Sequence, residues 1–490
     1  MLVYDATVER ADIAQIMAKD AEQLYRFEMS NKQYELFNAR TDQFKTMVRQ
    51  QTEELHISPV FLNEDGREQF ASNEILVELH DHDSNAIIAG IEQEYNLVRI
   101  DDESTRWLGD LIKFRLLPPY YQNSLDIANA LYESGLVALA DVNWVFDIEF
   151  YSVAPNDQYF GDQWNITQTM TDYAWNITTG SEDHIIAIVD EGVDLDHDDL
   201  SDNLLRDGSG NIIGINTTDT GPSNDPHPNG NDAHGTASAG VAAAVGNNSD
   251  GIAGATWNSK IMPIQIARDE FLDPGCPNNC RWTYNDWIVD GINFAASNGA
   301  HIISNSWGGT GHVQSVENAF NNAANGGAII IAAAGNYYPV NSTITQVRYP
   351  AAFSSVIAVG ATRENDVRKE LNDGSGEDWG SAYGDELDLV APGINIPTTD
   401  ISGSSGYSIN DYILNYAGTS SSTPLVAGVA ALMLSVNPNL TATQVRTILQ
   451  NTADWKSHMN SNEYGHGRLN AYEAVKHALP NQLNSPFFAV

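Results

Sequence analysis

Three residues that together can carry nucleophilic catalysis stand far apart in the chain, each beside an apolar stretch. Asp190 closes the run HIIAIV, His234 opens the stretch HGTASAGVAAAVG, and Ser420 opens SSSTPLVAGVAALML. A serine hydroxyl becomes a nucleophile when an imidazole takes its proton, and a carboxylate orients that imidazole and stabilises its charged form. The three groups could therefore carry out acyl transfer if the fold brings them together.

A fourth group could stabilise the negative charge that such a reaction develops. Asn336 directly follows the apolar run AIIIAAAG (328–335). A carboxamide N–H and the backbone amides at the start of a helix are typical donors to an oxyanion. Taken singly, these residues have ordinary alternatives as solvated or core side chains, and Ser421 and Ser422 flank Ser420. We expect the other histidines, His197 and His227 among them, to lie on the surface.

The elements that must position these groups are short runs that are apolar throughout. Such runs predict strands buried on both faces, in a parallel sheet between helix layers. Sites in such a sheet form at the carboxyl ends of its strands. The predicted strands cover 184–189, 261–267, 301–306, 328–335 and 356–361.

The first third of the chain has a different pattern. Apolar positions at helical spacing predict two amphipathic helices within 8–56. Beyond them, the order strand 75–79, helix 86–95, strands 97–100 and 112–117, helix 124–134 and strand 137–146 is that of a ferredoxin-like unit. We therefore divide the chain into a helical N-terminal region, a small α+β domain, a linker, a large α/β domain and a tail, at 1–71, 72–150, 151–163, 164–478 and 479–490.

Five motifs give the large domain a family resemblance. They are D-x-G-V-D-x-x-H-x-D-L from Asp190, H-G-T-x-x-A-G from His234, S-W-G from Ser306, A-A-G-N ending at Asn336, and G-T-S-x-x-T-P-x-V-A-G from Gly418. In this order they resemble the subtilisin family of serine proteases, over roughly 160 to 478. The resemblance implies a three-layer subtilisin-like fold and a serine endopeptidase. It leaves open a catalytically silent binding module and a peptide ligase or macrocyclase that uses the same acyl-enzyme.

The resemblance also implies a role for each matching residue. Ser420 is then the nucleophile, His234 the general base, Asp190 its partner and Asn336 the oxyanion donor. The substrate backbone would pair with Ser306, Trp307 and Gly308, and Gly335 would be a further substrate-binding residue. Arg348 falls near the floor of the first specificity pocket, where it would favour an acidic side chain if it points inward. Two departures, Glu191 and Ala237, leave these roles intact.

Calcium and an inhibitory propeptide follow from the same resemblance. Asp199 and Asn248 match the family's main calcium site, and calcium takes six to eight oxygen ligands. The small domain at 72–150 resembles the propeptide, which predicts a zymogen that inhibits itself and is processed within about 147–157. The implied partners are polypeptide substrates, and we expect a monomer that is secreted or periplasmic.

Composition limits the remaining functions. Asp+Glu 65 against Lys+Arg 24 gives a net charge of −41, which argues against binding to nucleic acid or to an anionic membrane. No apolar stretch reaches the length of a membrane span, and the N-terminal residues lack the pattern of a signal peptide. Cys276 and Cys280 lie in one loop and form either a disulfide or two free thiols.

Overall fold

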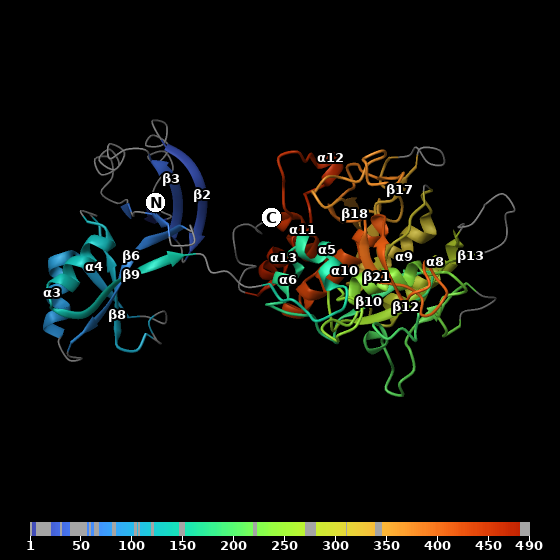
Figure 1. The fold of residues 1–490 in the computed structure, drawn as a ribbon, viewed down its shortest axis with the longest axis horizontal. Coiled ribbons are helices and arrows are strands. Elements are labelled where there is room, and N and C mark those ends of the chain that lie inside the picture. Colours follow the sequence, from blue (N-terminus) through green and yellow to red (C-terminus); the bar gives the residue numbers. More distant parts are fainter. Residues whose placement is uncertain are drawn as a thin grey trace. The chain divides into compact units, whose positions relative to one another are not determined.

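The computed structural model divides the chain into two compact units, residues 1–149 and 150–490 (Figure 1). It describes residues 2–5, 21–29, 32–39, 56–57, 60–62, 68–80, 85–101, 105, 108–118, 122–146, 152–218, 223–269, 281–309, 311–338 and 345–480. The predicted cysteine pair, the tail at 481–490 and the first part of the expected processing region lie outside these residues.

The second half of the N-terminal unit has the predicted ferredoxin-like order. Its elements are β6 (Glu68–Leu79), α3 (Asn85–Tyr95), β7 (Leu97–Ile100), β8 (Leu111–Leu116), α4 (Ser124–Glu133) and β9 (Val137–Phe146). All strand pairs are antiparallel, with β6 between β9 and β8, and β7 at the edge beyond β8. The strand β5 (Val60–Leu62) also pairs with β6. Residues of the sheet and both helices share one core, which includes Phe114, Ile75 and Leu131. The domain therefore resembles the propeptide as the sequence predicted.

The predicted helices of the first 56 residues are wrong where the structure describes this region. Strands β1 (Leu2–Asp5), β2 (Ala21–Met29), β3 (Lys32–Ala39) and β4 (His56–Ile57) form an antiparallel sheet in the order β2-β3-β1-β4. Within β2, the residues Tyr25, Phe27 and Met29 alternate with polar ones. This two-residue period and the aromatic side chains favour a strand, and pairing with β3 decides in its favour.

A seven-stranded parallel sheet forms the centre of the unit at 150–490, as predicted. Its order is β11-β12-β10-β15-β16-β18-β20. The strands are β10 (Ile185–Asp190), β11 (Ile215–Asn216), β12 (Lys260–Gln265), β15 (Ile302–Asn305), β16 (Ile329–Ala333), β18 (Ile357–Thr362) and β20 (Leu389–Pro392). The short β11 and β20 were not predicted from the sequence. The carboxyl ends of β10, β15 and β16 meet at one edge, where Asp190, Ser306 and Asn336 follow.

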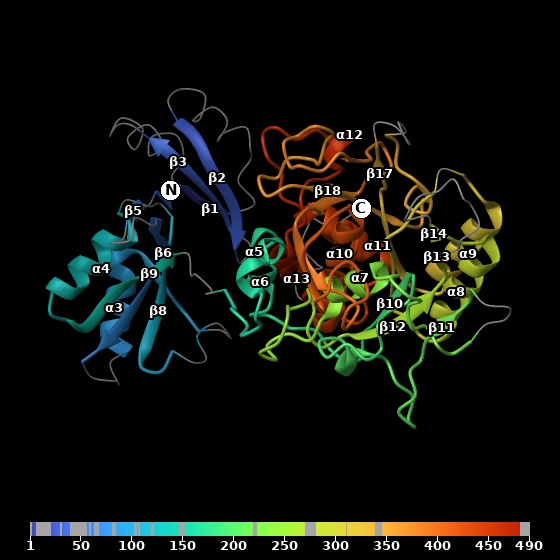
Figure 2. The ribbon, with the colours of Figure 1, turned by 45° about the vertical axis from the view of Figure 1, so that its right-hand side comes forward.

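Helices cover both faces of this sheet. Successive residues of each strand point to opposite faces, so alternate residues pack against different helix layers. Ile186 and Ile188 pack with α7 (His234–Ala243), α10 (Thr419–Val436) and α13 (Ala471–Ala478). Ala187 and Val189 pack with α8 (Asn285–Ser297) and α9 (Gln314–Asn325), which lie side by side in Figure 2. Both layers are apolar, so the strands read as continuous hydrophobic runs.

Among the described helices, α10 alone is long and apolar enough to cross a membrane by length and composition. Of its apolar window, 83% is buried inside the unit, as expected of a core helix. Gly428 lets it approach α7 closely, because a Cβ there would lie 2.6 Å from the Ala242 carbonyl oxygen. The apolar character of α10 is therefore explained by its packing, which fixes Ser420 near the start of the helix.

Candidate active site

Asp190 and His234 lie side by side at the carboxyl edge of the sheet. Asp190 ends β10 and His234 opens α7, and Nδ1 of His234 is 2.8 Å from Oδ1 of Asp190. The close approach depends on Gly235, where a Cβ would lie 2.0 Å from the Gly192 carbonyl oxygen. The backbone N–H of Glu191 donates to the same Asp190 oxygen at 2.9 Å. The imidazole is therefore held with its other nitrogen, Nε2, free of Asp190.

The surroundings of His234 act on its pKa in opposite directions. Burial lowers the pKa of His234, because a low-dielectric site disfavours the charged imidazolium. The negative charge of Asp190 and its hydrogen bond raise it, and together they outweigh burial, so the pKa lies above its ordinary value. An imidazole in this state is a stronger proton acceptor than a free histidine, which suits a general base.

Ser420 is the second residue of α10 and lies in the same cleft as His234 and Asp190. Its hydroxyl donates to the Ser306 carbonyl oxygen at 2.8 Å, and the Ser306 hydroxyl donates to the Ser420 carbonyl oxygen at 3.0 Å. The neighbouring hydroxyls are used inside the fold: Ser421 donates to the Gly418 carbonyl oxygen and Ser422 to that of Ala391. Of the three serines, Ser420 is the one that lines the cleft together with His234.

The Asn336 carboxamide is oriented by Thr419. Its Oδ1 accepts hydrogen bonds from the backbone N–H and the hydroxyl of Thr419, at 3.0 and 3.1 Å. Its Nδ2 therefore points away from Thr419, toward the space beside Gly418. A Cβ placed on Gly418 would lie 3.1 Å from Asn336 Nδ2 and 3.4 Å from the Ser420 backbone nitrogen. Two N–H donors thus converge on one small space, the arrangement needed to stabilise an oxyanion.

We expect the substitution Gly418→Ala to block this space. The added methyl group would stand between the two donors. The backbone at this position has φ +128°, a conformation that is strained for any residue other than glycine. Loss of one oxyanion donor costs about 10² to 10³ in kcat, so we expect a loss of at least that size with KM nearly unchanged, measured on a chromogenic peptide.

The control for this variant is Gly299→Ala, which has φ +82° and open space around its Cβ position. It introduces similar strain away from the cleft and should leave kcat within about threefold. A Gly418→Ala enzyme with the same kcat as the control would contradict the assignment of this space.

The segment that follows β15 borders the cleft. Trp307 donates its indole N–H to the Val189 carbonyl oxygen at 2.9 Å, and Gly309 pairs with Tyr349 through two backbone hydrogen bonds of 2.8 and 3.0 Å. Ser306, Trp307, Gly308, Gly335 and Arg348 line a cleft of about 480 Å³ together with the residues above. The structure therefore brings all the residues predicted for catalysis and substrate binding to one cleft.

Comparison with known proteins identifies the family. The model of the Subtilase family matches residues 181–467. The chain belongs to the subtilase family. It is 37% identical over 350 residues to a thermophilic serine proteinase from Bacillus sp. strain AK1, covering 71% of this chain and 75% of that one. It is 36% identical over 324 residues to thermitase from Thermoactinomyces vulgaris, covering 66% of this chain and 99% of thermitase.

A solved structure agrees with this result. A protease structure from Pseudoalteromonas arctica matches with a TM-score of 0.54 and 28% identity, covering 66% of this chain and 99% of the other. The subtilase described here is therefore a serine-type, subtilisin-like peptidase, and polypeptides are its substrates. A further relative, 33% identical over 379 residues, is named a calcium-dependent protease of Nostoc, of which the match covers 52%.

The predicted calcium residues lie together in the catalytic unit, with a carboxylate that the sequence did not single out. Asn248 Nδ2 donates to Asp199 Oδ1 at 2.8 Å. Asp157 accepts the Asn247 N–H at 2.8 Å through Oδ2, while its buried Oδ1 has no hydrogen-bond partner. Burial raises the pKa of Asp199 to about 7 and also raises that of Asp157. Two buried carboxylates, one with an unused oxygen, fit a cation with oxygen ligands.

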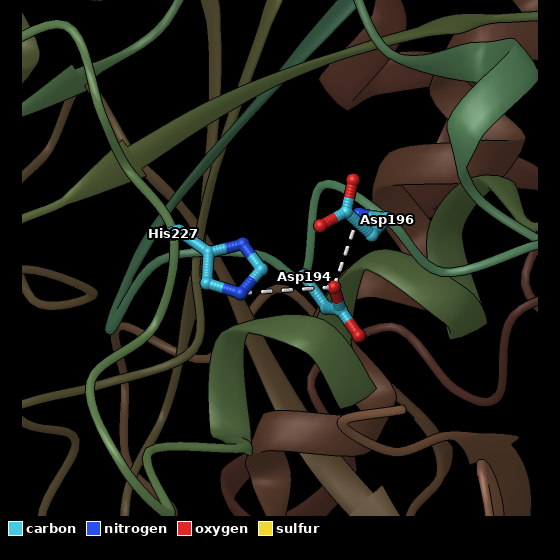
Figure 3. Close-up of side chains that lie close together, drawn as sticks. All are labelled: Asp194, Asp196 and His227. Atoms are coloured by element: carbon cyan, nitrogen blue, oxygen red, sulfur yellow. Dashed lines mark hydrogen bonds and ion pairs between the residues drawn. The ribbon is translucent and has the colours of Figure 1, made fainter. Parts of the chain in front are cut away.

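A second acidic group lies nearby in sequence. Potential ligand atoms of Asp194, Asp196 and His227 lie within 4.8 Å of one another (Figure 3). Burial would raise the pKa of Asp194, but hydrogen bonds from Ser402 and the Asp196 N–H, together with His227, lower it. These contacts satisfy Asp194 without an ion.

The expectation that His197 lies on the surface is wrong. It is 1% exposed, and its Nε2 is 2.9 Å from the Asp411 carbonyl oxygen. Its ring packs edge-on against Tyr412, so the residue joins two loops. His227, in contrast, keeps 39% of its side chain exposed, as expected.

Proposed function

We propose that this subtilase is a serine endopeptidase that uses Ser420, His234 and Asp190 as its catalytic triad. The observation that carries the proposal is the 2.8 Å contact between His234 Nδ1 and Asp190 in the cleft that also contains Ser420 and the Asn336 donor. The contact holds one imidazole nitrogen, so Nε2 is the atom that can exchange a proton with the substrate side of the cleft.

The reaction follows from these positions. The Ser420 hydroxyl turns from the Ser306 carbonyl toward His234, gives its proton to Nε2 and attacks the substrate carbonyl carbon. The oxyanion accepts hydrogen bonds from Asn336 Nδ2 and the Ser420 N–H. The C–N bond breaks as His234 returns the proton to the amine, which leaves an ester on Ser420. Water, deprotonated by His234, then hydrolyses the ester and restores the hydroxyl.

Asp190 does not take a proton in this scheme. Its charge orients the imidazole and stabilises the imidazolium that forms at both proton transfers. Glu191 lies next to it and accepts the His234 backbone N–H only weakly, at 3.4 Å. The neighbouring carboxylate therefore supports the start of α7 and leaves the triad contact in place.

We also propose that the chain is made as a precursor that inhibits itself, because the ferredoxin-like domain of its N-terminal unit resembles a propeptide. We place the processing site upstream of Val153. Val153 donates its N–H to the Asp172 carbonyl oxygen, Asp157 accepts from Asn247, and Tyr159 donates to the Gly251 carbonyl oxygen. Cleavage within 147–152 keeps these contacts in the mature enzyme, whereas cleavage further along would remove them.

The experiment that tests the proposal combines labelling and mass measurement. The purified full chain is treated with a fluorophosphonate, which forms a covalent bond only with an activated serine, and the labelled peptide is identified. We expect a label on Ser420, hydrolysis of casein, and loss of about the first 150 residues. A folded chain that stays unlabelled and keeps its full mass would support a silent binding module. Products 18 Da lighter than the substrate peptide would support a macrocyclase.

We also propose that calcium binds at Asp157 and Asp199, with Asn248 as a further oxygen donor once its amide turns. Bound calcium would supply positive charge that compensates two buried carboxylates and fixes the loop at 246–254 to the segment at 153–159. The two segments are also joined by hydrogen bonds such as those between Asn156 and Ser249.

We expect calcium removal to destabilise the wild type and to have little effect on Asp157→Asn. A ligand at 100 times its Kd adds about 2.7 kcal/mol to the free energy of unfolding, which corresponds to a rise in Tm of several degrees for a unit of this size. The measurement is thermal unfolding in calcium and in EGTA. The control is Asp162→Asn, an exposed aspartate of the same segment. Equal calcium shifts in both variants would exclude Asp157 as a ligand.

A further inference from the structure

The lining of the cleft contains one fixed positive charge. Arg348 is the only lysine or arginine among the described residues that line the cleft. The two carboxylates of the lining, Asp190 and Glu191, belong to the triad end. In a chain with a net charge of −41, a basic side chain in this position is a departure from its surroundings.

The backbone of Arg348 is anchored in the wall of the cleft. Its N–H donates to the Ala334 carbonyl oxygen at 2.9 Å, and its carbonyl accepts from Ala352 at 2.9 Å. The next residue, Tyr349, pairs with Gly309 on the opposite segment. The side chain therefore starts between the segment after β15 and the segment after β16.

Two glycines leave the space that the Arg348 side chain fills. A Cβ on Gly335 would lie 2.6 Å from Arg348 Cδ, 2.9 Å from Cγ and 3.0 Å from Nε. A Cβ on Gly308 would lie 3.4 Å from Arg348 Cβ. Almost any other residue at 335 would displace the arginine, so its stem runs across the face of Gly335, directly before the oxyanion donor Asn336.

This placement defines which part of a substrate meets the guanidinium. Asn336 and the Ser420 N–H receive the oxygen of the carbonyl that is attacked. Because Gly335 directly precedes Asn336, the side chain of that same substrate residue can enter the cleft beside Gly335, where Arg348 lies. We propose that Arg348 makes this subtilase selective for substrates with an acidic residue immediately before the cleaved bond. This inference rests on the proposed function of the cleft.

The electrostatics of the site agree with this geometry. Burial lowers the pKa of Arg348, so the guanidinium has lost part of its hydration although it remains charged. A carboxylate that enters the cleft makes a charge-assisted hydrogen bond in a site of reduced dielectric, and such bonds are about twice as strong as neutral ones. An uncharged amide of the same shape gains less, and a lysine side chain is repelled.

The test compares substrates that differ in one residue. The wild-type enzyme is assayed on succinyl-Ala-Ala-Pro-X-p-nitroanilides with Glu, Gln, Phe or Lys at X. We expect kcat/KM for Glu to exceed that for Gln by about 10- to 100-fold, the range of one charge-assisted hydrogen bond. The ratio should fall in 1 M NaCl, because salt screens a partly exposed pair.

Variants assign this preference to Arg348. Arg348→Gln and Arg348→Met should both bring the Glu to Gln ratio to about one. Methionine preserves the packing of the stem on Gly335, so it covers the case in which glutamine disturbs the fold. The control, Arg206→Gln, removes an exposed arginine whose guanidinium donates to Gly210 and should keep the wild-type ratio.

The outcomes separate this proposal from the one on which it rests. An active wild type with a Glu to Gln ratio near one would overturn the role of Arg348 and leave the peptidase function standing. The same ratio in Arg348→Met and in wild type would also overturn it. A wild type that hydrolyses none of the four substrates, and no casein, would contradict the proposed function instead.

Discussion

Ser420→Ala should lower kcat by about six orders of magnitude. Removal of the nucleophile leaves an imidazole with no hydroxyl to activate, and the remaining acceleration comes from oxyanion stabilisation and substrate binding alone. We expect the variant to keep its fold, because it loses a single side-chain hydrogen bond, that to the Ser306 carbonyl oxygen. It should also stay at full mass, since we propose that the chain processes itself.

Three further variants make this prediction specific. Ser422→Ala is the matched control two residues along α10: its hydroxyl contacts the Ala391 and Pro392 carbonyl oxygens, so its loss should lower stability by about 1 kcal/mol and leave kcat within a few-fold. His234→Ala alone and combined with Ser420→Ala should each lose about as much as Ser420→Ala, because the two groups act as a unit. Losses that multiply would show that they act independently.

The chain order of the reactive groups made much of this site predictable. Asp190, His234, Asn336 and Ser420 each stand at a boundary between an apolar run and a following loop or helix, and a parallel sheet brings such boundaries to one edge. The prediction needed no distances, but the choice of Ser420 over Ser421 and Ser422, and the role of each group, came from the resemblance to the subtilisin family. The resemblance placed Arg348 near the specificity pocket. The path of its side chain across Gly335 became clear only from the structure.

Asp157 was not predicted from the sequence, because no local sequence pattern marks it as a ligand. It is one of 65 acidic residues in the chain, in a segment that composition marked as a linker, and nothing local distinguishes it. Only the fold shows that it is buried beside Asp199 with an unused oxygen. The strands β2 and β3 were missed because their apolar residues fit both a helical and an alternating period, and pairing between strands is a non-local property.

Asp190→Asn should lower kcat by about 10⁴ while KM changes little. The carboxamide can occupy the same space, but one of its two faces presents an N–H to His234 Nδ1, which favours the wrong tautomer and leaves no negative charge to stabilise the imidazolium. The Asp190 carboxylate also receives the Glu191 N–H at 2.9 Å, and a carboxamide can satisfy that donor only by turning its oxygen. The control is Asp198→Asn, an exposed aspartate eight residues further along, which should keep kcat within about twofold.

The pH profile gives this prediction a second readout. Hydrolysis requires neutral His234, so kcat/KM of the wild type should rise with pH as the imidazolium loses its proton. Asp190 raises the pKa of His234 against the effect of burial, so the wild-type midpoint should lie above the ordinary histidine pKa of about 6.5. In Asp190→Asn only burial remains, and the midpoint of the residual activity should move to lower pH. A midpoint that stays in place, or rises, would mean that the charge of Asp190 does not act on His234, and the triad assignment would fail even if kcat fell as expected.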